Sequence, residues 1–517
     1  MRSSGGLLII ISSFLCLFCF VALLFKIFHK IWWTPNCIQK LMASQGIRGP
    51  PYRLIHGNTK EISNMYKEAR SRPLSLSHDN IFPVVLPHIH AWTKIYGKNY
   101  LQWHGTLPQL VVTEADLCKE IFTNKDGVYL KPKFRPYAKK VFGNGLPALE
   151  GEKWVKSRRL ANHAFRGESL NNMIPDMIAS AETMLDRWKS HEEGKEMEVY
   201  EEFRLLTSEV ISRTAFGSSY VEGKNIFDML MKFSLLLKND YILKFPGISM
   251  LFKTNDDIKS EKLAQGIRDS IMGIIKKREE KAMSGEEERF GSDFLGLLLK
   301  AHHDTNDIQR ISVDDLVDEC KSFYLVGQET SNTLLSWTVL LLALHTDWQE
   351  KARMEVLQLF GKQAPNPDGL AKLKTMSMIF NESLRLYSPA VTVTRRVEKD
   401  VRLGKLIIPA NFELIVPYLA LHHEPQSWGQ DAQLFKPERF FEGVAKATNN
   451  NLTSFMPFGM GPRICVGLNF ATVEAKIALS MILQRYSFTL SPGYVHSPLR
   501  SMTLRPQHGV QVMLHSL

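Results

Sequence analysis

One cysteine stands in a glycine-rich stretch that could hold a metal. Cys465 follows Gly459 and Gly461 and precedes Gly467, with Phe458 at the start of the stretch. Glycines permit a tight loop in which backbone N–H groups point at the sulfur, and such donors stabilise a thiolate and tune a metal bound to it. A helix that begins near Gly467 would also direct its positive end towards the sulfur. Because a lone buried cysteine is usually only a small apolar side chain, the interpretation depends on the whole pattern.

A carboxylate beside a hydroxyl is the second candidate for chemistry. Glu329 and Thr330 lie within a long apolar segment, where a carboxylate costs free energy if it serves only as filler. This pair favours a proton relay, in which Thr330 hydrogen-bonds the oxygen that reacts and Glu329 supplies protons through water. The alternative is a threonine hydroxyl that only bonds back to its own helix.

Long helices are expected to position these residues, and they are predicted over residues 312–345, 347–361 and 370–387. Ser312 and Asp315 form a capping box at the start of the first helix. A helix this long and this apolar is expected to cross the protein interior. Asp347 is predicted to cap the second helix, and Pro389 stops the third.

The β structure is expected to be small and separate from the helices. Alternating apolar residues predict strands over residues 100–104, 109–113, 401–408 and 412–419. Gly105 and Pro108 supply the first turn, and residues 409–411 supply the second. Thr113 and Asp116 resemble a capping box for the helix that follows the first pair of strands. The fold class is therefore mainly α with a small β region.

The N-terminus carries an apolar run that could cross a membrane. Leu7 to Phe25 contains no charge, and nineteen residues at about 1.5 Å each are long enough for a bilayer core. A cleavable signal peptide has a shorter apolar region of about 7–15 residues. Here Lys26, Lys30, Trp32 and Trp33 follow the run, which favours an uncleaved anchor whose C-terminal side stays in the cytosol.

This interpretation divides the chain into an anchor over residues 1–33, a linker with a proline-rich hinge over 34–53, and one catalytic domain over 54–517.

The net charge is 64 − 53 = +11, with a pI near 9.2. Such a surplus suggests an acidic partner or an anionic membrane surface. No compact Lys/Arg tract interleaved with aromatic residues is present, so we expect no nucleic-acid partner. Six scattered cysteines indicate a reducing compartment rather than a disulfide scaffold.

Further segments complete a recognisable set of motifs. Glu382 and Arg385 have ExxR spacing, residues 437–440 read PERF, and Trp154 and Arg158 have WxxxR spacing. ExxR is weak alone, because such a salt pair occurs on many solvated helices, and the Trp154/Arg158 pair alone could belong to an ordinary amphipathic helix. Together with FxxGxRxCxG over residues 458–467, they resemble the motifs of cytochromes P450, in the same order along the chain. The resemblance implies the cytochrome P450 fold, preceded by one N-terminal transmembrane helix.

The resemblance also implies a cofactor and its surroundings. The cofactor would be haem b (iron protoporphyrin IX), with the iron bound by Cys465. Either Arg395 or Arg396 would hold one haem propionate. The other residues that the resemblance assigns to the cofactor are Phe458, Arg463, Trp154 and Arg158.

The family pattern assigns two further roles. Glu382, Arg385 and Arg439 would form a buried ion network with a structural role behind the cysteine loop. Residues 327–331 resemble the family's oxygen-activating segment, with Glu329 and Thr330 as catalytic residues. Val326 departs from the small residue that is usual at its position, which puts the shape of the pocket in question.

A monooxygenase is the function that this resemblance implies. It would insert one oxygen atom from O2 into a lipophilic small molecule, with NADPH-derived electrons supplied only indirectly, through a flavoprotein reductase. The protein would lie in the endoplasmic reticulum membrane as a single-pass protein, in contact with lipid, with its catalytic domain facing the cytosol. One alternative is a reductase-independent family member that rearranges peroxides or dehydrates, and another is a non-catalytic haem-binding protein. The pair Glu329-Thr330 argues against both.

Finer features resemble one plant clan of cytochromes P450, which includes secologanin synthase and brassinosteroid-inactivating hydroxylases. They are Gly151–Trp154, Arg158-Arg159, Phe165, His423–Pro425 and Trp428–Ala432. This resemblance implies a terpenoid or hormone-like substrate. The histidine pairs at 302–303 and 422–423 lack a partner at zinc spacing, so we expect them at the surface.

Overall fold

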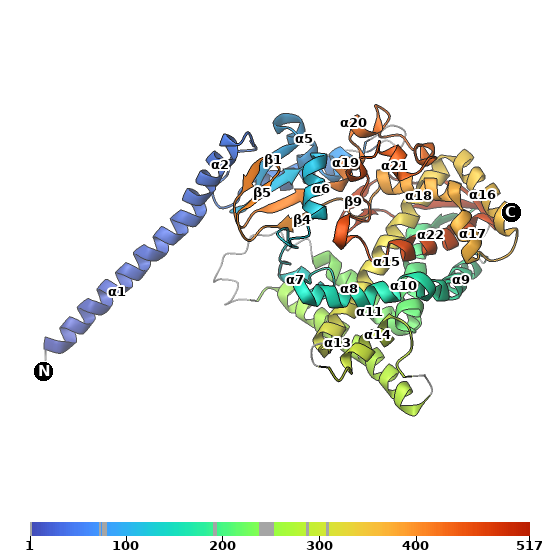
Figure 1. Ribbon diagram of the computed structural model, residues 1–517, viewed down its shortest axis with the longest axis horizontal. Helices are drawn as coiled ribbons and strands as arrows, with labels where there is room; N and C mark the ends of the chain where they lie inside the picture. The colour runs from blue at the N-terminus through green and yellow to red at the C-terminus, as the bar shows by residue number, and fades with distance from the viewer. Residues whose placement is uncertain are drawn as a thin grey trace.

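A long helix, α15 (Val313–Leu344), runs through the centre of the molecule, and the other large helices pack around it (Figure 1). The computed structural model describes residues 3–71, 74, 80–189, 194–236, 253–285, 289–306 and 310–517. The fold is mostly helical with small β-sheets, as predicted.

The other helices lie before and after α15 in the sequence and are separated mostly by short connections. Before α15 they are α1 Ser3–Phe28, α2 Thr34–Ser44, α3 Thr59–Ser71, α4 Phe82–Val85, α5 Pro87–Tyr96, α6 Ala115–Thr123, α7 Pro136–Phe142, α8 Gly151–Ala164, α9 Gly167–Lys189, α10 Val199–Phe216, α11 Tyr220–Leu236, α13 Asn255–Ser284 and α14 Phe294–His302. After it they are α16 Thr346–Phe360, α17 Pro367–Lys372, α18 Lys374–Leu386, α19 Tyr418–His422, α20 Pro425–Trp428, α21 Val444–Ala447 and α22 Leu468–Leu483. A π-helical segment is η1 His29–Trp33, and short 3₁₀ segments are η3 Pro437–Phe440, η4 Leu452–Ser454 and η5 Gly461–Arg463.

The strands form small sheets. They are β1 Asn99–His104, β2 Leu107–Val112, β3 Glu196–Glu198, β4 Val393–Arg396, β5 Val401–Leu403, β6 Leu406–Ile408, β7 Glu413–Val416, β8 Tyr486–Leu490, β9 Pro498–Arg500, β10 Leu504–Pro506 and β11 Gln511–Ser516. One sheet has the order β1-β2-β7-β4, in which β2 and β7 are parallel and the other neighbours are antiparallel. The other sheets are β3-β11-β8, β5-β6 and β9-β10.

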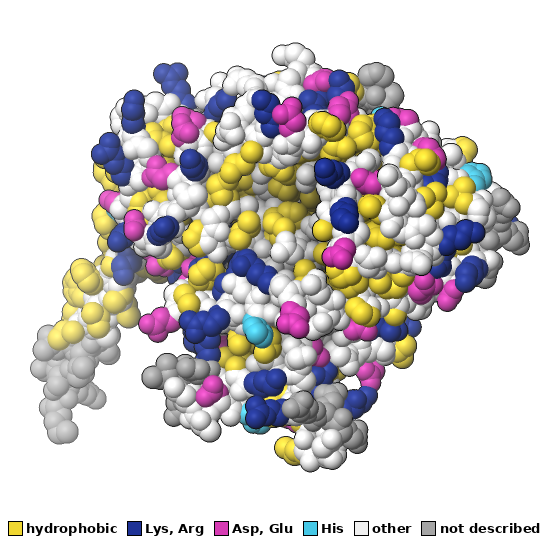
Figure 2. Space-filling model, turned by 45° about the vertical axis from the view of Figure 1, so that its right-hand side comes forward, with side chains coloured by type: hydrophobic (Ala, Val, Ile, Leu, Met, Phe, Trp, Pro, Cys, Tyr) yellow, Lys and Arg dark blue, Asp and Glu magenta, His cyan; other side chains and the backbone are white. Residues whose placement is uncertain are grey.

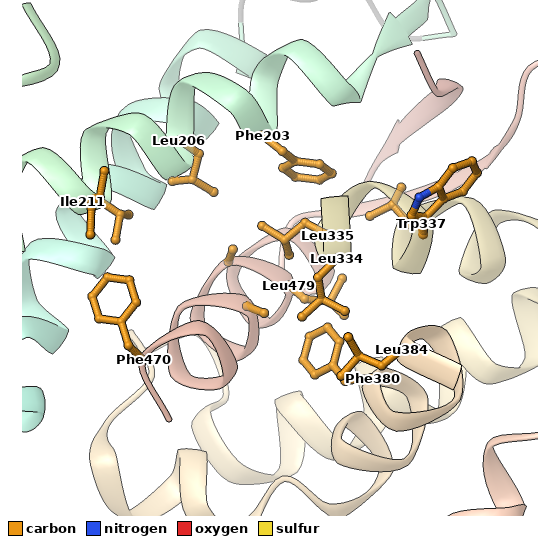
Figure 3. Packing of buried hydrophobic residues seen from close by; sticks show 14 of the residues in the cluster. Phe203, Leu206, Ile211, Leu334, Leu335, Trp337, Phe380, Leu384, Phe470 and Leu479 are labelled. Atoms are coloured by element: carbon orange, nitrogen blue, oxygen red, sulfur yellow. The ribbon is translucent and has the colours of Figure 1, made fainter. Parts of the chain in front are cut away.

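Helix α15 begins and ends where the sequence predicts. The Ser312 hydroxyl accepts the N–H of Asp315 at 3.0 Å, which caps the first turn. Its apolar face packs against α10, α18 and α22, and Figure 3 shows Leu334 and Leu335 meeting side chains from all three helices. Because α15 is enclosed on several sides, a polar residue on it is held in a fixed environment.

Two predicted helix starts are wrong. Asp347 lies inside the first turn of α16, which follows His345 and has no side-chain cap. Thr113 caps no helix, because its hydroxyl donates to the carbonyl of Lys98 at 2.6 Å and extends the strand pairing; α6 starts after Glu114. Thr113 thus bonds Lys98, and the Asp347 carboxylate accepts from Lys351 at 3.2 Å instead of capping the helix.

The predicted helix over residues 370–387 is two helices. The backbone leaves the helical conformation at Leu373, with ψ near 87°. The carboxylate of Glu355 accepts the N–H groups of Lys374, Thr375 and Met376 at 2.7–3.0 Å. A side chain from α16 therefore supplies the cap that starts α18, and no local pattern announces it.

The strand prediction over residues 401–408 is also corrected. These residues form a complete hairpin, in which β5 pairs with β6 around Gly404, whose φ is +56°. Residues 412–419 do not pair with that hairpin. Strand β7 joins β2 and β4 instead and stops before Pro417, and α19 takes up the following residues.

The N-terminal helix continues into the first part of the predicted linker, and the proline-rich part is not helical. Helices α1, η1 and α2 follow one another without a break from Ser3 to Ser44, so only residues 45–53 connect them to the rest. Met42 is fully buried, the Gln45 amide bonds the backbone of Ile407 in both directions, and Tyr52 donates to the carbonyl of Ile31 at 2.7 Å. The C-terminal end of this N-terminal helical stretch is therefore attached to the rest of the protein.

One helical stretch in the described part of the chain, within residues 10–44, is long and apolar enough to cross a membrane. Figure 2 shows apolar side chains covering this projecting helix, whereas Lys and Arg alternate with Asp and Glu over the body of the protein. The exposed side chains include Phe14, Phe18 and Phe25, each more than 60% accessible. Apolar surface of this kind is stable only in lipid or against a partner.

We expect deletion of residues 1–33 to remove the integral association with membranes, because the deletion removes the apolar span. The remaining protein, with its basic surface, would still adhere peripherally to anionic membranes in a salt-dependent way. The measurement is extraction of full-length and truncated protein with alkaline carbonate and with high salt. Release of the full-length protein by carbonate would contradict the anchor.

Candidate active site

The cysteine loop has the geometry that the glycines suggested. The N–H of Cys465 donates to the carbonyl of Phe458 at 2.8 Å, which closes the loop, and α22 begins just after Gly467. A Cβ atom on Gly461 would lie 2.2 Å from the carbonyl oxygen of Phe122, so only glycine fits there. Burial raises the pKa of the Cys465 thiol, whereas the N–H of Gly467 and the charge of Arg158 lower it.

Helix α8 lies against this loop and presents Arg158 and Trp154 to it. The Arg158 guanidinium is buried and donates to the carbonyl of Ile464, the residue before the cysteine, at 2.6 Å. Trp154 lies under the guanidinium of Arg463, 4.2 Å from it. Arg463 donates to the carbonyl of Leu149 at 2.7 Å. The WxxxR spacing therefore brings both side chains of α8 to the cysteine loop.

Several cations gather beside the loop. Arg463 forms an ion pair with Glu150 and feels the charges of Arg395 and Arg158. Burial, together with the charges of Arg395 and Arg463, lowers the pKa of Lys131 to about 7, and Glu150 acts in the opposite direction. Among the described residues, Arg463, Arg395 and Lys131 thus share the carboxylate of Glu150, and Arg158 lies near Arg463. An additional anion here would be electrostatically favourable.

Arg395 and Arg396 lie in different environments, because successive residues of a strand point to opposite faces. Arg395 is 5% exposed and lies 5.1 Å from the ring centre of Phe122, among the cations just described. Arg396 forms an ion pair with Glu398 instead. Of the two arginines that the sequence left open, Arg395 is the one beside the cysteine loop.

The central helix α15 places the side chains of Glu329 and Thr330 beside different hydrogen-bond partners. Thr503 donates to the Glu329 carboxylate at 2.7 Å, from the turn between β9 and β10. Burial raises the pKa of Glu329, and the bond from Thr503 and the charges of Arg505 and Arg204 act in the opposite direction. The Thr330 hydroxyl donates to the carbonyl of Val326 at 2.8 Å, the back-bond that the sequence allowed as an alternative.

Gly327, the glycine in this segment, lies against the neighbouring helix α10. A Cβ atom on Gly327 would lie 2.9 Å from the side chain of Ile211, so the glycine leaves room for α10 beside α15 at this point. Val326, one residue earlier, is 36% exposed, unlike the buried Leu334 and Leu335 further along the helix. Val326 and Thr330 are one turn apart and share a stripe of α15.

Glu382, Arg385 and Arg439 meet in a buried network. The Arg385 guanidinium and the Glu382 carboxylate are both inaccessible and form two bonds of 2.7 Å. Arg439 approaches Glu382 at 3.4 Å and is held more tightly by Asp431, at 2.7 Å. Backbone carbonyls accept further donors of both arginines, although the Nε of Arg439 makes no hydrogen bond to a described residue. Both guanidinium charges thus face a carboxylate.

Comparison with known proteins agrees with this geometry. Residues 86–514 match the family Cytochrome P450. The chain is 58% identical to "Cytochrome P450 CYP749A22" of Panax ginseng over 509 residues, 98% of this chain and 96% of that protein.

The chain belongs to the cytochrome P450 family. It is also 42% identical to "11-oxo-beta-amyrin 30-oxidase" of Glycyrrhiza uralensis over 500 residues, 95% of this chain and 94% of that protein. Identity to "Cytochrome P450 734A1" of Arabidopsis thaliana is likewise 42%, over 495 residues, 94% of this chain and 93% of that protein. The predicted family, its haem cofactor and its class of enzyme, a monooxygenase, are confirmed.

The residues of this cytochrome P450 fit the cofactor of its family. Thiolate sulfur is an established axial ligand of haem iron, and Cys465 is a cysteine whose sulfur faces the N–H of Gly467. The two propionates of haem are anions, and the surplus of cations around Glu150 suits them. The iron and the carboxylates of the cofactor thus each find complementary groups.

One sequence prediction at this site is wrong. His422 and His423 are buried, 0% and 6% exposed, and not surface residues. The Nε2 atom of His422 accepts the N–H of Met456 at 3.0 Å, while its carbonyl accepts from Arg385 at 3.0 Å. Burial lowers the pKa of both rings, to about 3 for His423. A neutral histidine therefore connects the ion network to the segment that leads into the cysteine loop.

Three further residues of the site were missed by sequence reasoning: Lys131, Glu150 and Thr503. Lys131 and Glu150 flank the loop region before α8, and the N–H of Lys131 donates to the Glu150 carboxylate at 2.5 Å. An isolated Lys-Pro-Lys run and an acidic residue before Gly151 were the only signals. Thr503 carries no signal, because its partner Glu329 is 174 residues away.

Proposed function

We propose that this cytochrome P450 inserts one oxygen atom from O2 into a triterpenoid-like substrate, with electrons from an NADPH-dependent flavoprotein reductase. The observation that carries the oxygenation is the pair Glu329-Thr330 on a buried helix, with the carboxylate held by Thr503. Such a pair is needed where protons are delivered to oxygen, and not where a peroxide only rearranges. The triterpenoid class is supported by the 42% identity to an 11-oxo-beta-amyrin 30-oxidase.

The haem-holding residues follow from the site. Cys465 would ligate the iron, with Phe458 and the N–H of Gly467 shaping its loop. Arg158 and Arg395, together with Trp154 and Arg463, would face the propionates. Haem would supply the oxygen chemistry there, and the Cys465 thiolate would push electron density onto the iron, which favours cleavage of the O–O bond.

Protons would reach the reacting oxygen from the Glu329 side of α15. Because burial raises its pKa, Glu329 holds a proton at a higher pH than an exposed glutamate does. The Thr330 hydroxyl donates to Val326 in this structure, and it can turn to a partner beside the helix for about 1 kcal/mol, the net value of one hydrogen bond. Glu329 would then restore the proton through water.

We expect Thr330→Ala to uncouple the enzyme, because the change removes the hydroxyl without touching Cys465 or the ion network. Haem content would be retained and NADPH would still be consumed, but hydrogen peroxide would replace product. Positioned proton donors contribute roughly 10²–10⁴-fold. Water and Ser331 can replace part of this, so we expect the ratio of product to NADPH to fall about 10-fold.

The measurement is that ratio, with peroxide determined in parallel. Thr338→Ala is a matched control, since Thr338 is buried on the same helix two turns further along. Wild-type coupling in the Thr330→Ala variant would show that Thr330 only bonds back to its helix.

The substrate class and the electron source are tested together. The full-length protein is reconstituted in lipid vesicles and titrated with triterpenoids, starting with 11-oxo-beta-amyrin, while the haem spectrum is recorded. Ligands that change the spectrum are then incubated with NADPH, with and without reductase. We expect an oxygenated product only when reductase is present. Product formation without reductase would favour the reductase-independent class instead.

The location proposed is the endoplasmic reticulum membrane, with one span and the catalytic domain in the cytosol. Support comes from Lys26 and Lys30 directly after the apolar run, because positive residues are retained on the cytosolic side. Trp32 and Trp33 lie at the same end, where aromatic residues favour the membrane interface. Protease treatment of intact microsomes would digest a cytosolic domain and spare a lumenal one.

A further inference from the structure

A short loop over residues 143–149, between α7 and α8, is attached to the central helix. The N–H of Asn144 donates to the Asp318 carboxylate at 2.7 Å, and the N–H of Leu146 donates to the Glu319 carboxylate at 3.0 Å. Two adjacent carboxylates of α15 thus hold two alternate amides of one loop. Glu319 is 2% exposed, so its bond is shielded from water.

The glycines of the loop allow this attachment. A Cβ atom on Gly143 would lie 2.0 Å from Asp318 Cγ, and one on Gly145 would lie 2.2 Å from Ser322 Oγ. Asp318 is also paired with Lys321 at 2.6 Å, which fixes the carboxylate. A side chain at Gly143 or Gly145 would therefore move the loop away from α15.

The other end of the loop reaches the cysteine loop. Arg463 donates to the carbonyl of Leu149 at 2.7 Å and pairs with the carboxylate of Glu150, the next residue. Arg463 in turn precedes Cys465 by two residues. The loop therefore connects the helix that carries Glu329 and Thr330 to the loop that carries Cys465.

We propose that Asp318 and Glu319 are positioning residues for the metal-binding side of the site, because they hold the loop that places Glu150 against Arg463. The inference rests on the proposed haem site. Glu150 offsets one positive charge beside Cys465, and displacement of the loop would remove this compensation. An uncompensated cation near a haem favours the reduced form, so the reduction potential would rise.

The test combines amide exchange with a double-mutant cycle. Gly145→Ala displaces the loop, and Gly273→Ala is the control, because a Cβ on Gly273 meets nothing within 4 Å. We expect the exchange of the amides of Asn144 and Leu146 to become at least about 10-fold faster in the first variant only, as for the loss of bonds to carboxylates. Exchange does not depend on substrate or turnover, so it reports on the loop even if the proposed activity is wrong.

The reduction potential supplies the second readout. Gly145→Ala and Glu150→Gln are each expected to raise it, and the double variant is expected to shift it no further than Glu150→Gln alone. Additive shifts, or unchanged exchange, would overturn the proposal. If Gly145→Ala does not fold, Asp318→Asn keeps the shape of the side chain, weakens the bond to Asn144 and takes its place in the same cycle.

Discussion

The Cys465→Ala variant is expected to lose the absorbance that carbon monoxide gives with thiolate-ligated ferrous haem. The reason is that no other cysteine can replace Cys465. Cys118 and Cys320 are buried elsewhere, with a pKa raised by burial, and Cys16, Cys19 and Cys37 lie in the N-terminal helices. Turnover would fall to background, since the ligand that drives O–O cleavage is gone.

The measurement is the reduced carbon monoxide difference spectrum of folded protein, checked by circular dichroism. Cys320→Ala is the control, because Cys320 is a buried thiol of α15. The control is expected to keep the spectrum, although the small cavity lowers stability. A folded Cys465→Ala protein with the wild-type spectrum would show that the iron ligand is another residue.

Glu382→Ala is expected to destabilise the protein by about 3–5 kcal/mol, because it leaves a buried guanidinium without its carboxylate. Arg385 is 0% exposed and cannot turn to water. Since native proteins are stable by only about 5–15 kcal/mol, much of the variant would accumulate unfolded and without haem. His422 would transmit the damage to the segment before the cysteine loop.

Haem content per protein and the thermal unfolding midpoint measure this effect. Glu350→Ala is a matched control, since Glu350 pairs with Arg353 at the same i,i+3 spacing but is 56% exposed. Exposed pairs contribute about 0–1 kcal/mol, so the control is expected to remain close to wild type. Equal effects of the two substitutions would mean that the Glu382 network contributes no more than a surface pair.

Features that depend on neighbours in sequence were predicted well. The cysteine loop needs glycines at fixed offsets from Cys465, and a loop of this kind is closed by its own backbone. Helix α15 was predicted with its cap at Ser312, because capping and apolar periodicity act within a few residues. The i,i+3 pair Glu382–Arg385 and the apolar N-terminal helix are local in the same sense.

Only the tertiary structure decided which distant partner each remaining polar group finds. Glu355 starts α18 from the previous large helix. Buried His422 is held by two groups from separate segments, the Arg385 guanidinium and the N–H of Met456. Arg395 and not Arg396 joins the cations beside the cysteine loop, because the two side chains lie on opposite faces of the sheet. Hydrogen bonds and charges across tens or hundreds of residues leave no periodicity or spacing in the sequence, because chain folding alone brings the partners together. The chemistry of this cytochrome P450 was therefore readable from its motifs, and the network that holds Cys465, Glu329 and their surroundings in place was readable only from the fold.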